Sequence, residues 1–214
     1  MRGLLLFARS RRWGLNVLVS LASGAAMVAC GPLSYELNPR GGYLIAVSAQ
    51  IALLPAVVIA ASLATSLREQ ESQAARYLPK WRFLHVALLS LVAAGTAALA
   101  ATQLAPPPDA LVNAYAALGP LAFARNVFAL TGSALVFSAI AGPSFGWILP
   151  LGWAILPFLA LPSLDADTTG ILTLVMQPDD AFLPFIASLA VWGTGALLAA
   201  RNWSISNALS GLAP

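Results

Sequence analysis

Five long stretches of this chain contain no Asp, Glu, Lys or Arg, and they limit its possible folds more than any other feature. They are residues 13–35, 41–67, 83–108, 126–164 and 181–200. About 20 apolar residues in a helix cross the hydrocarbon core of a bilayer. Only 9% of the 214 residues are charged, whereas soluble domains have about 25%. We therefore predict an all-α, polytopic protein of the cell membrane.

The charge-free stretches predict six transmembrane helices. Residues 126–164 are too long for one span and are interrupted by Gly142-Pro143-Ser144, so they are expected to form a helical hairpin. The six predicted spans are residues 13–31, 43–64, 84–104, 126–141, 145–163 and 182–200. They form one transmembrane domain, residues 13–200, between a basic N-terminal segment, 1–12, and a C-terminal tail, 201–214.

The basic residues predict the orientation of these helices. If the N-terminus is inside, nine of the eleven basic residues lie on the cytosolic side: Arg2, Arg9, Arg11, Arg12, Arg68, Arg76, Lys80, Arg82 and Arg201. Arg40 and Arg125 then lie outside, with six of the eight acids. Positive residues favour the cytosolic side of a membrane, so both termini are predicted to be cytosolic. The net charge of +3 reflects this orientation, and no nucleic-acid partner is expected.

Two apolar segments on the predicted outer side are too interrupted to be confident spans. Residues 105–124 contain a proline run and Gly119-Pro120, and residues 164–181 have an apolar centre framed by acid pairs. We expect both to lie at the membrane interface. The acids of the second segment are predicted to form a solvated rim and not a cation site: Asp165, Asp167, Asp179 and Asp180.

Several local motifs have simpler explanations than catalysis. Residues 142–146, GPSFG, match the G-x-S-x-G elbow of serine hydrolases, but that elbow follows a strand, and here it joins two apolar stretches. A helix-hairpin turn is the better interpretation. His85 is the only histidine, so a zinc site is not expected, and an interfacial polar anchor is predicted instead. Pro150, Pro157 and Pro162 are expected to bend or break the fifth span.

The chain lacks an obvious energy source of its own. A P-loop needs a lysine after its glycines, and the only lysine is Lys80, in LPKW. No ionisable group lies inside a predicted span, although ion-coupled carriers usually place one there. We expect no enzymatic activity and no cofactor or metal on this chain. A set of uncharged polar residues could line a translocation path: Ser48, Gln50, Thr131 and Ser133.

Charge is concentrated between the second and third spans. There Leu67, Ala74, Leu78 and Trp81 recur at spacings of 7, 4 and 3, which place them on one face of a helix. The charged residues lie mostly off that face: Arg68, Glu69, Glu71 and Arg76. We predict a short amphipathic cytosolic helix at about residues 66–79, ended by Pro79.

This arrangement resembles the membrane subunits of ABC-2-type transporters. The resemblance lies in the topology and in residues 68–82, REQESQAARYLPKWR. It implies that the amphipathic helix docks into a separate cytosolic ATPase, which binds ATP and Mg²⁺. The expected contact residues are Leu67, Arg68, Glu69, Glu71, Ala74, Leu78 and Trp81. The resemblance also implies a homo- or heterodimer of membrane subunits that exports a lipophilic compound or a peptide.

Three alternatives remain open from the sequence. The charged segment between spans two and three could be a solvated loop that fixes topology and contacts no partner. The chain could be a structural or assembly subunit of another membrane complex, which would also lack ionisable groups at depth. A membrane enzyme is a third class, but the sequence contains no recognisable catalytic constellation.

Overall fold

The structure is a computed structural model, and it describes residues 12–30, 34–38, 43–63, 78–104, 119–160, 179–180 and 182–201. The helices are α2 (Trp13–Ala29), α3 (Val47–Gln50), α4 (Leu53–Ala61), α6 (Leu78–Ala101), α8 (Pro120–Ala141), α9 (Ile148–Ala160) and α10 (Phe182–Ala200). A short 3₁₀ turn, η1 (Pro143–Phe145), precedes α9. The strands are β1 (Ser34–Asn38) and β2 (Tyr43–Ala46).

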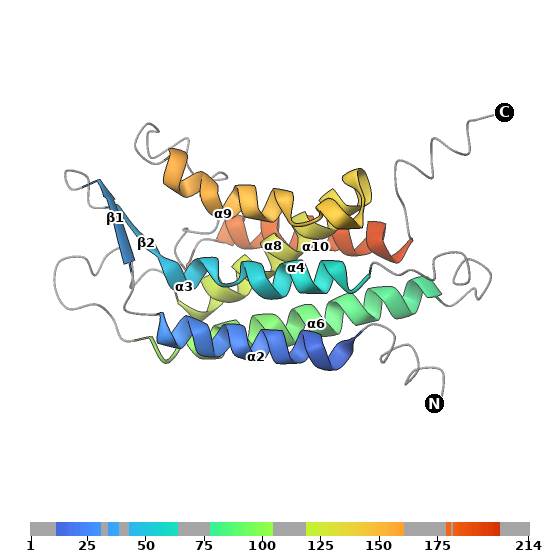
Figure 1. The fold of residues 1–214 in the computed structure, drawn as a ribbon, viewed down its shortest axis with the longest axis horizontal. Coiled ribbons are helices and arrows are strands. Elements are labelled where there is room, and N and C mark those ends of the chain that lie inside the picture. Colours follow the sequence, from blue (N-terminus) through green and yellow to red (C-terminus); the bar gives the residue numbers. More distant parts are fainter. Residues whose placement is uncertain are drawn as a thin grey trace.

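The long helices lie side by side in an elongated bundle with α8 at its centre (Figure 1). Helix α8 packs against α10, α6, α4 and α9. Its buried side chains Phe123, Val127 and Leu130 are at most 1% exposed, and the first half of α8 thereby meets α4 and α6 in the main apolar core. The bundle is therefore organised around one helix and not around a shared central axis.

Among the described residues, three helices are long and apolar enough to cross a bilayer: Pro79–Ala101, Pro120–Ala141 and Phe182–Ala200. Trp13–Ala29 and Val47–Ala61 are shorter apolar helical segments. The described part of the chain is thus compatible with insertion in a membrane. Each of the six predicted spans contains a helix, but crossing by all six stays a prediction.

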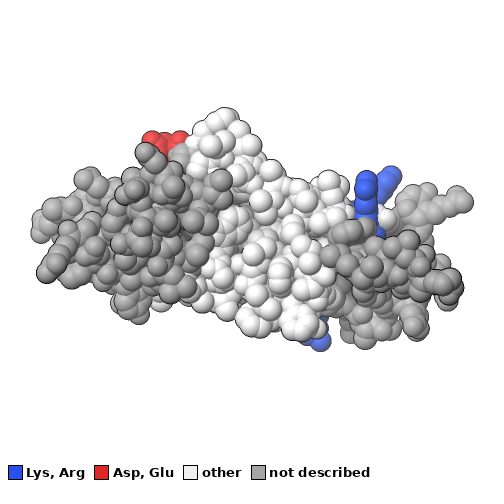
Figure 2. Space-filling model, turned by 90° about the horizontal axis from the view of Figure 1, so that it is seen from above, with Lys and Arg blue, Asp and Glu red and all other residues white. Residues whose placement is uncertain are grey.

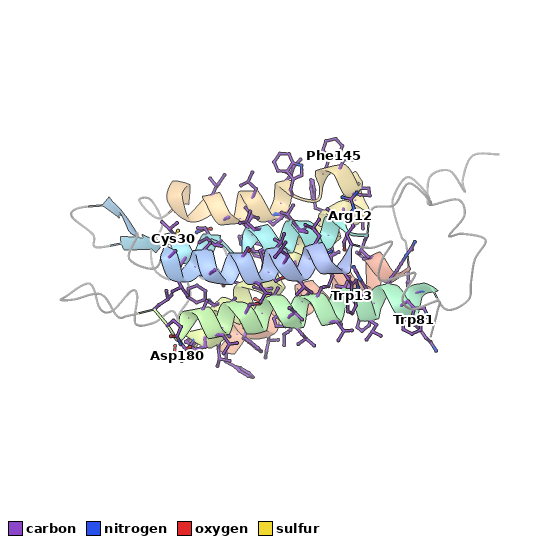
Figure 3. All side chains as sticks on the ribbon, turned by 60° about the horizontal axis from the view of Figure 1, so that its bottom comes forward. Arg12, Trp13, Cys30, Trp81, Phe145 and Asp180 are labelled. Atoms are coloured by element: carbon purple, nitrogen blue, oxygen red, sulfur yellow. The ribbon has the colours of Figure 1, made fainter. Side chains whose placement is uncertain are left out.

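Charged side chains lie at the two ends of the bundle. Figure 2 shows basic residues toward one end of the visible face, acidic residues toward the other, and a charge-free middle. In Figure 3, Arg12 and Trp81 lie at one end and Asp180 at the other. A charge-free middle is what a hydrocarbon core requires. Which end faces the cytosol stays a prediction.

The predicted second span, residues 43–64, is wrong at its start. Strand β1 pairs antiparallel with β2, with Tyr35 opposite Ile45, and only then does the chain enter α3. A turn at Ile51 and Ala52 separates α3 from α4. The run Tyr43–Ile45 consists of residues that suit strands as well as apolar helices, and hydropathy alone does not distinguish the two. Within the described residues, the regular secondary structure is helical apart from this hairpin.

Pro79, which was expected to end a helix, instead lies in the first turn of one, and so does Pro120. Pro79 is the second residue of α6, and Pro120 is the first residue of α8. Proline is tolerated there because the first-turn N–H groups have no intrahelical acceptor. Helix α8 therefore starts six residues before the predicted position, 126. Within the segment 105–124, residues 119–124 belong to this helical start and residues 105–118 lie outside the described part.

The predicted turn between the fourth and fifth spans is confirmed. Gly142 ends α8 with a φ of 98°, a value that side-chain-bearing residues rarely adopt. The 3₁₀ turn then leads into α9, which continues through both Pro150 and Pro157. The predicted break does not occur in Ile148–Ala160, and Pro162 lies outside the described residues.

Candidate functional site

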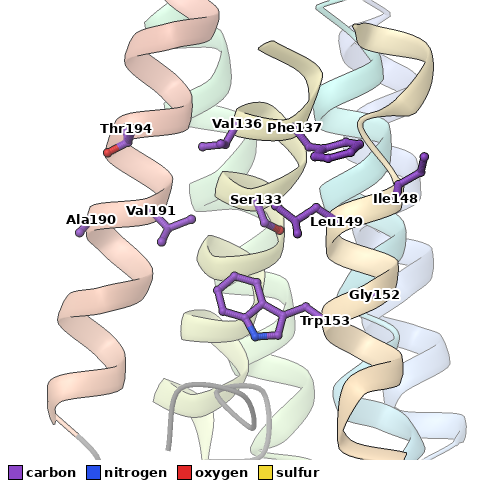
Figure 4. Close-up of a pocket in the computed structure, with 10 residues that line it drawn as sticks. All are labelled: Ser133, Val136, Phe137, Ile148, Leu149, Gly152, Trp153, Ala190, Val191 and Thr194. Carbon is purple, nitrogen blue, oxygen red and sulfur yellow. The ribbon is translucent and has the colours of Figure 1, made fainter. Parts of the chain in front are cut away.

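A groove lies between α9 and α10, with α8 as its floor (Figure 4). Its volume is about 810 Å³, within the range of about 300–1,000 Å³ that small-molecule sites occupy. Ten described residues line it: Ser133, Val136, Phe137, Ile148, Leu149, Gly152, Trp153, Ala190, Val191 and Thr194. We call this feature the α9–α10 groove.

Close packing of α8 on α10 forms one wall of the groove. A Cβ added to Gly132 would lie 2.5 Å from Trp192 Cα, and one added to Gly195 would lie 2.6 Å from the Gly132 carbonyl oxygen. Only glycine fits at such distances, so the two backbones touch. Gly195 of α10 therefore contacts α8 of the same chain.

The opposite wall, α9, leaves space. A Cβ added to Gly152 would meet no atom within 4 Å, although Gly152 lines the groove. Ile148 and Leu149 are each 40% exposed. The turn after α8 brings α9 back alongside α8, where Gly146 lies against Ser138. The start of α9 is thus fixed to α8, whereas its groove side presents small or loosely packed groups.

The chemistry of the groove is nearly all apolar. Among its described lining residues none is ionisable. Ser133 donates a hydrogen bond to the Leu130 carbonyl oxygen at 2.9 Å, so its hydroxyl is already used within α8 and has only acceptor capacity left. Thr194 is exposed on α10. Such a surface suits a neutral, lipophilic molecule that makes at most a few hydrogen bonds.

The four predicted path residues do not form one site. Ser133 lines the groove. Thr131, two residues earlier, is fully buried and lies about 200° around the helix from Ser133. Ser48 and Gln50 are on α3, and neither is among the groove residues. The side-chain hydroxyls of Ser48 and Thr131 and both amide atoms of Gln50 are buried without a hydrogen-bond partner in the described structure.

The predicted ATPase contact is mostly outside the described residues. Leu67, Arg68, Glu69, Glu71 and Ala74 belong to residues 64–77, which the structure does not describe. Leu78 is the first residue of α6. Trp81 is 38% exposed and lies near the end of the bundle that also holds Arg12 (Figure 3). The prediction that Pro79 ends a helix before this point is wrong, because α6 begins there.

A buried polar cluster at the same end was not predicted. His85 on α6 is 1% exposed. The indole N–H of Trp13 on α2 donates to His85 Nδ1, and the hydroxyl of Ser62, just after α4, lies 2.8 Å from His85 Nε2. The expectation of an interfacial anchor was wrong because three chain segments enclose the ring. Trp13 and His85 are 72 residues apart, and no local pattern connects them.

The end of the bundle that holds Asp180 also differs from the prediction. Arg125 was placed in an outer loop, but it lies in α8 and is 1% exposed. Asp179 Oδ1 accepts a hydrogen bond of 2.5 Å from the Ala122 amide. Burial disfavours the Arg125 charge, and the Asp179 carboxylate offsets part of this cost. Asp179 is therefore a helix cap and not part of a solvated rim. Asp180 is exposed, and Asp165 and Asp167 lie outside the described residues.

Comparisons with protein-family descriptions, curated proteins and solved structures found no match to this chain. Among the described residues, no group of three His, Cys, Asp or Glu side chains is placed to hold a metal ion. The α9–α10 groove is a described feature with the size and lining of a small-molecule site.

Proposed function

We propose that this chain is the membrane-spanning permease subunit of an ABC-2-type exporter in the cell membrane. It moves a lipophilic compound outward, and a separate cytosolic ATPase supplies the energy. The observation that carries the proposal is the α9–α10 groove, which is apolar and large enough for a drug-sized molecule. The resemblance of residues 68–82 to the docking segment of that family supports the ATPase part.

The groove can select a ligand although it offers little hydrophobic driving force. A lipophilic molecule that is already dissolved in the bilayer gains nothing from leaving water, because lipid tails are as apolar as the groove walls. Discrimination then comes from shape and from hydrogen bonds. Trp153 and Thr194 line the groove, and the indole of Trp153 provides a planar surface that acyl chains do not.

The energy has to come from a partner in this proposal. Trp81 is exposed, and together with residues 67–78 it is the proposed contact for the ATPase. A dimer of membrane subunits with two ATPase subunits would complete the transporter. ATP and Mg²⁺ would then bind to the partner and not to this chain.

Copurification tests the proposal. The tagged chain, extracted from its native membrane in mild detergent, is expected to bring down an ATPase in stoichiometric amount. The double charge reversal Glu69→Lys and Glu71→Lys is expected to reduce that recovery at least threefold with unchanged membrane insertion. The control is Asp180→Lys, a reversal at the opposite, exposed end of the bundle, which should leave recovery unchanged.

One observation favours the second candidate, a structural or assembly subunit of another membrane complex. Phe182 and Leu183, at the start of α10, are 74% and 75% exposed, so a neighbouring subunit could cover them as well as lipid does. In that case the tagged chain would bring down a different membrane complex and no ATPase. That result would show the exporter proposal to be wrong.

A further inference from the structure

The hydrogen bonds around His85 run in one direction. An indole N–H can only donate, so Trp13 makes Nδ1 of His85 the acceptor. The Ser62 hydroxyl donates to the Ile59 carbonyl oxygen at 2.6 Å, so toward His85 Nε2, 2.8 Å away, its oxygen acts as the acceptor. All three contacts are satisfied together only by a neutral imidazole whose proton is on Nε2. We call Trp13, Ser62 and His85 the histidine clasp.

The histidine clasp joins three helices at one end of the bundle. Trp13 is the first residue of α2, Ser62 follows α4, and His85 lies in the second turn of α6. The Trp13 and His85 rings also contact each other, with centroids 5.9 Å apart. In sequence, Ser62 and His85 lie on either side of residues 64–77. The clasp therefore ties the two helices that flank the predicted ATPase contact to each other and to α2.

The exposure of Trp81 and Arg82 shows how far the clasp lies from the surface of the bundle. Trp81 precedes His85 by four residues on α6 and is exposed, whereas Arg82 is only 5% exposed. One turn of α6 therefore separates Trp81, which a partner protein can contact, from His85, which is buried among three helices. A displacement of this end of α6 cannot leave α2 and α4 unmoved while the clasp is intact, because coupling between sites travels through contiguous packed and hydrogen-bonded groups.

We infer that His85 is a positioning residue that transmits movement from the ATPase contact to α2 and α4. This inference rests on the proposed function. While the clasp is intact, movement of the ATPase displaces α2, α4 and α6 as a unit, and the energy of ATP hydrolysis is thereby transmitted to the bundle. Without it, the ATPase still binds and hydrolyses ATP, but less of the movement reaches the bundle, so fewer molecules are transported per ATP.

The first test uses the fact that the chain has one histidine. Nitrogen-15 labelling of histidine in the full chain therefore gives the NMR signals of one imidazole without assignment. We expect shifts of a neutral ring protonated on Nε2, and we expect Trp13→Phe to remove the tautomer preference. The control is Trp147→Phe, which removes an indole donor bonded to the Ser144 carbonyl oxygen at 3.0 Å. A proton on Nδ1 in the unmodified chain would overturn the clasp.

The second test measures transport per ATP hydrolysed by the chain and its copurified ATPase in vesicles. Trp13→Phe and Ser62→Ala are each expected to lower this ratio about threefold to tenfold, the range that the net strength of one hydrogen bond allows, with ATPase recovery unchanged. The matched controls are Trp147→Phe and Ser188→Ala, because Ser188 donates to the Pro184 carbonyl oxygen of its own helix, at 2.8 Å. Both should keep the full ratio.

The outcomes separate the two proposals. If the unmodified chain recovers no ATPase, the proposed function fails, and the inference fails with it. If the ATPase is recovered and Trp13→Phe transports as many molecules per ATP as Trp147→Phe, the function stands and the inference is overturned. A thermal unfolding measurement on each variant in detergent shows whether a lower ratio merely follows from lost fold, in which case the inference is also overturned.

Discussion

Helix α8 meets its two late neighbours in opposite ways. Against α10 the contact is so close that glycine backbones touch at Gly132 and Gly195. Beside α9 the packing is looser, and a groove of about 810 Å³ opens between α9 and α10, above α8. Both neighbours are apolar and contain glycine and alanine, so composition does not determine the difference. The position of each glycine does: Gly132 lies in the contact, whereas Gly152 has no atom within 4 Å of an added Cβ.

The largest expected effect comes from disrupting the close contact between α8 and α10, which we call the closed side of α8; the side toward the groove is the open side. Gly132→Val would place a branched side chain where even a Cβ lies 2.5 Å from the Trp192 backbone, so α10 has to move away. Overpacking usually costs about 1–3 kcal/mol, and backbone atoms yield least, so we expect a loss of about 3 kcal/mol or more in unfolding free energy. Denaturation in detergent, followed by circular dichroism, measures it.

The matched control for this change is on the open side. Gly152→Ala adds a methyl group where no atom lies within 4 Å, and alanine is a better helix former than glycine by about 1 kcal/mol. We expect equal or slightly higher stability. Equal destabilisation by Gly132→Val and Gly152→Ala would show that the two sides of α8 do not differ as described.

The next largest effect concerns ligand binding in the α9–α10 groove, on the open side of α8. Ala190→Trp fills part of the groove with a large ring, and we expect it to weaken binding of a neutral lipophilic fluorescent probe at least tenfold, or about 1.4 kcal/mol. Fluorescence titration in detergent micelles measures this. Leu197→Trp is the control, since Leu197 is 53% exposed on α10 but does not line the groove. Equal loss in both variants would exclude the groove as the probe site.

The smallest effect concerns the hydrogen bond that joins the segment before α10 to the start of α8. Asp179, three residues before α10, bonds the Ala122 amide in the first turn of α8. Loss of such a cap costs about 1 kcal/mol, so Asp179→Ala should lower the unfolding free energy by about that amount. Asp180→Ala, at an exposed neighbour, should have almost no effect. If both variants are equally stable, the closed side is held by the glycine contact alone.

The helix positions could be predicted from the sequence where charged residues flank both ends of an apolar run. Helix α10 occupies residues 182–200 as predicted, because Asp180 and Arg201 stand directly outside a continuous apolar run. The start of α8 could not be found in this way, since Arg125 lies inside the helix. Burial there disfavours the positive charge, and the Asp179 carboxylate, 54 residues away in the chain, offsets part of that cost.

The candidate site could be predicted only in part. Ser133 was among the predicted path residues, and it lines the groove. Ser48, Gln50 and Thr131 do not line it, because polarity at depth says nothing about the direction in which a side chain points. The histidine clasp depends on pairs between distant segments, and only the folded arrangement shows them. The contact proposed at residues 67–78 stays a prediction.

The burial of α8 has a consequence for how the chain is inserted into its membrane. Of the three long apolar helices, α8 has the lowest mean hydropathy, 1.4, and the largest buried share, 72%, against 1.8 and 17% for α10. A helix that enters lipid alone exposes every side to the acyl chains, which suits α10 better than α8. During synthesis α6 is made before α8, and α10 is made after it. The face of α8 that packs against α10 therefore stays uncovered until α10 has been made.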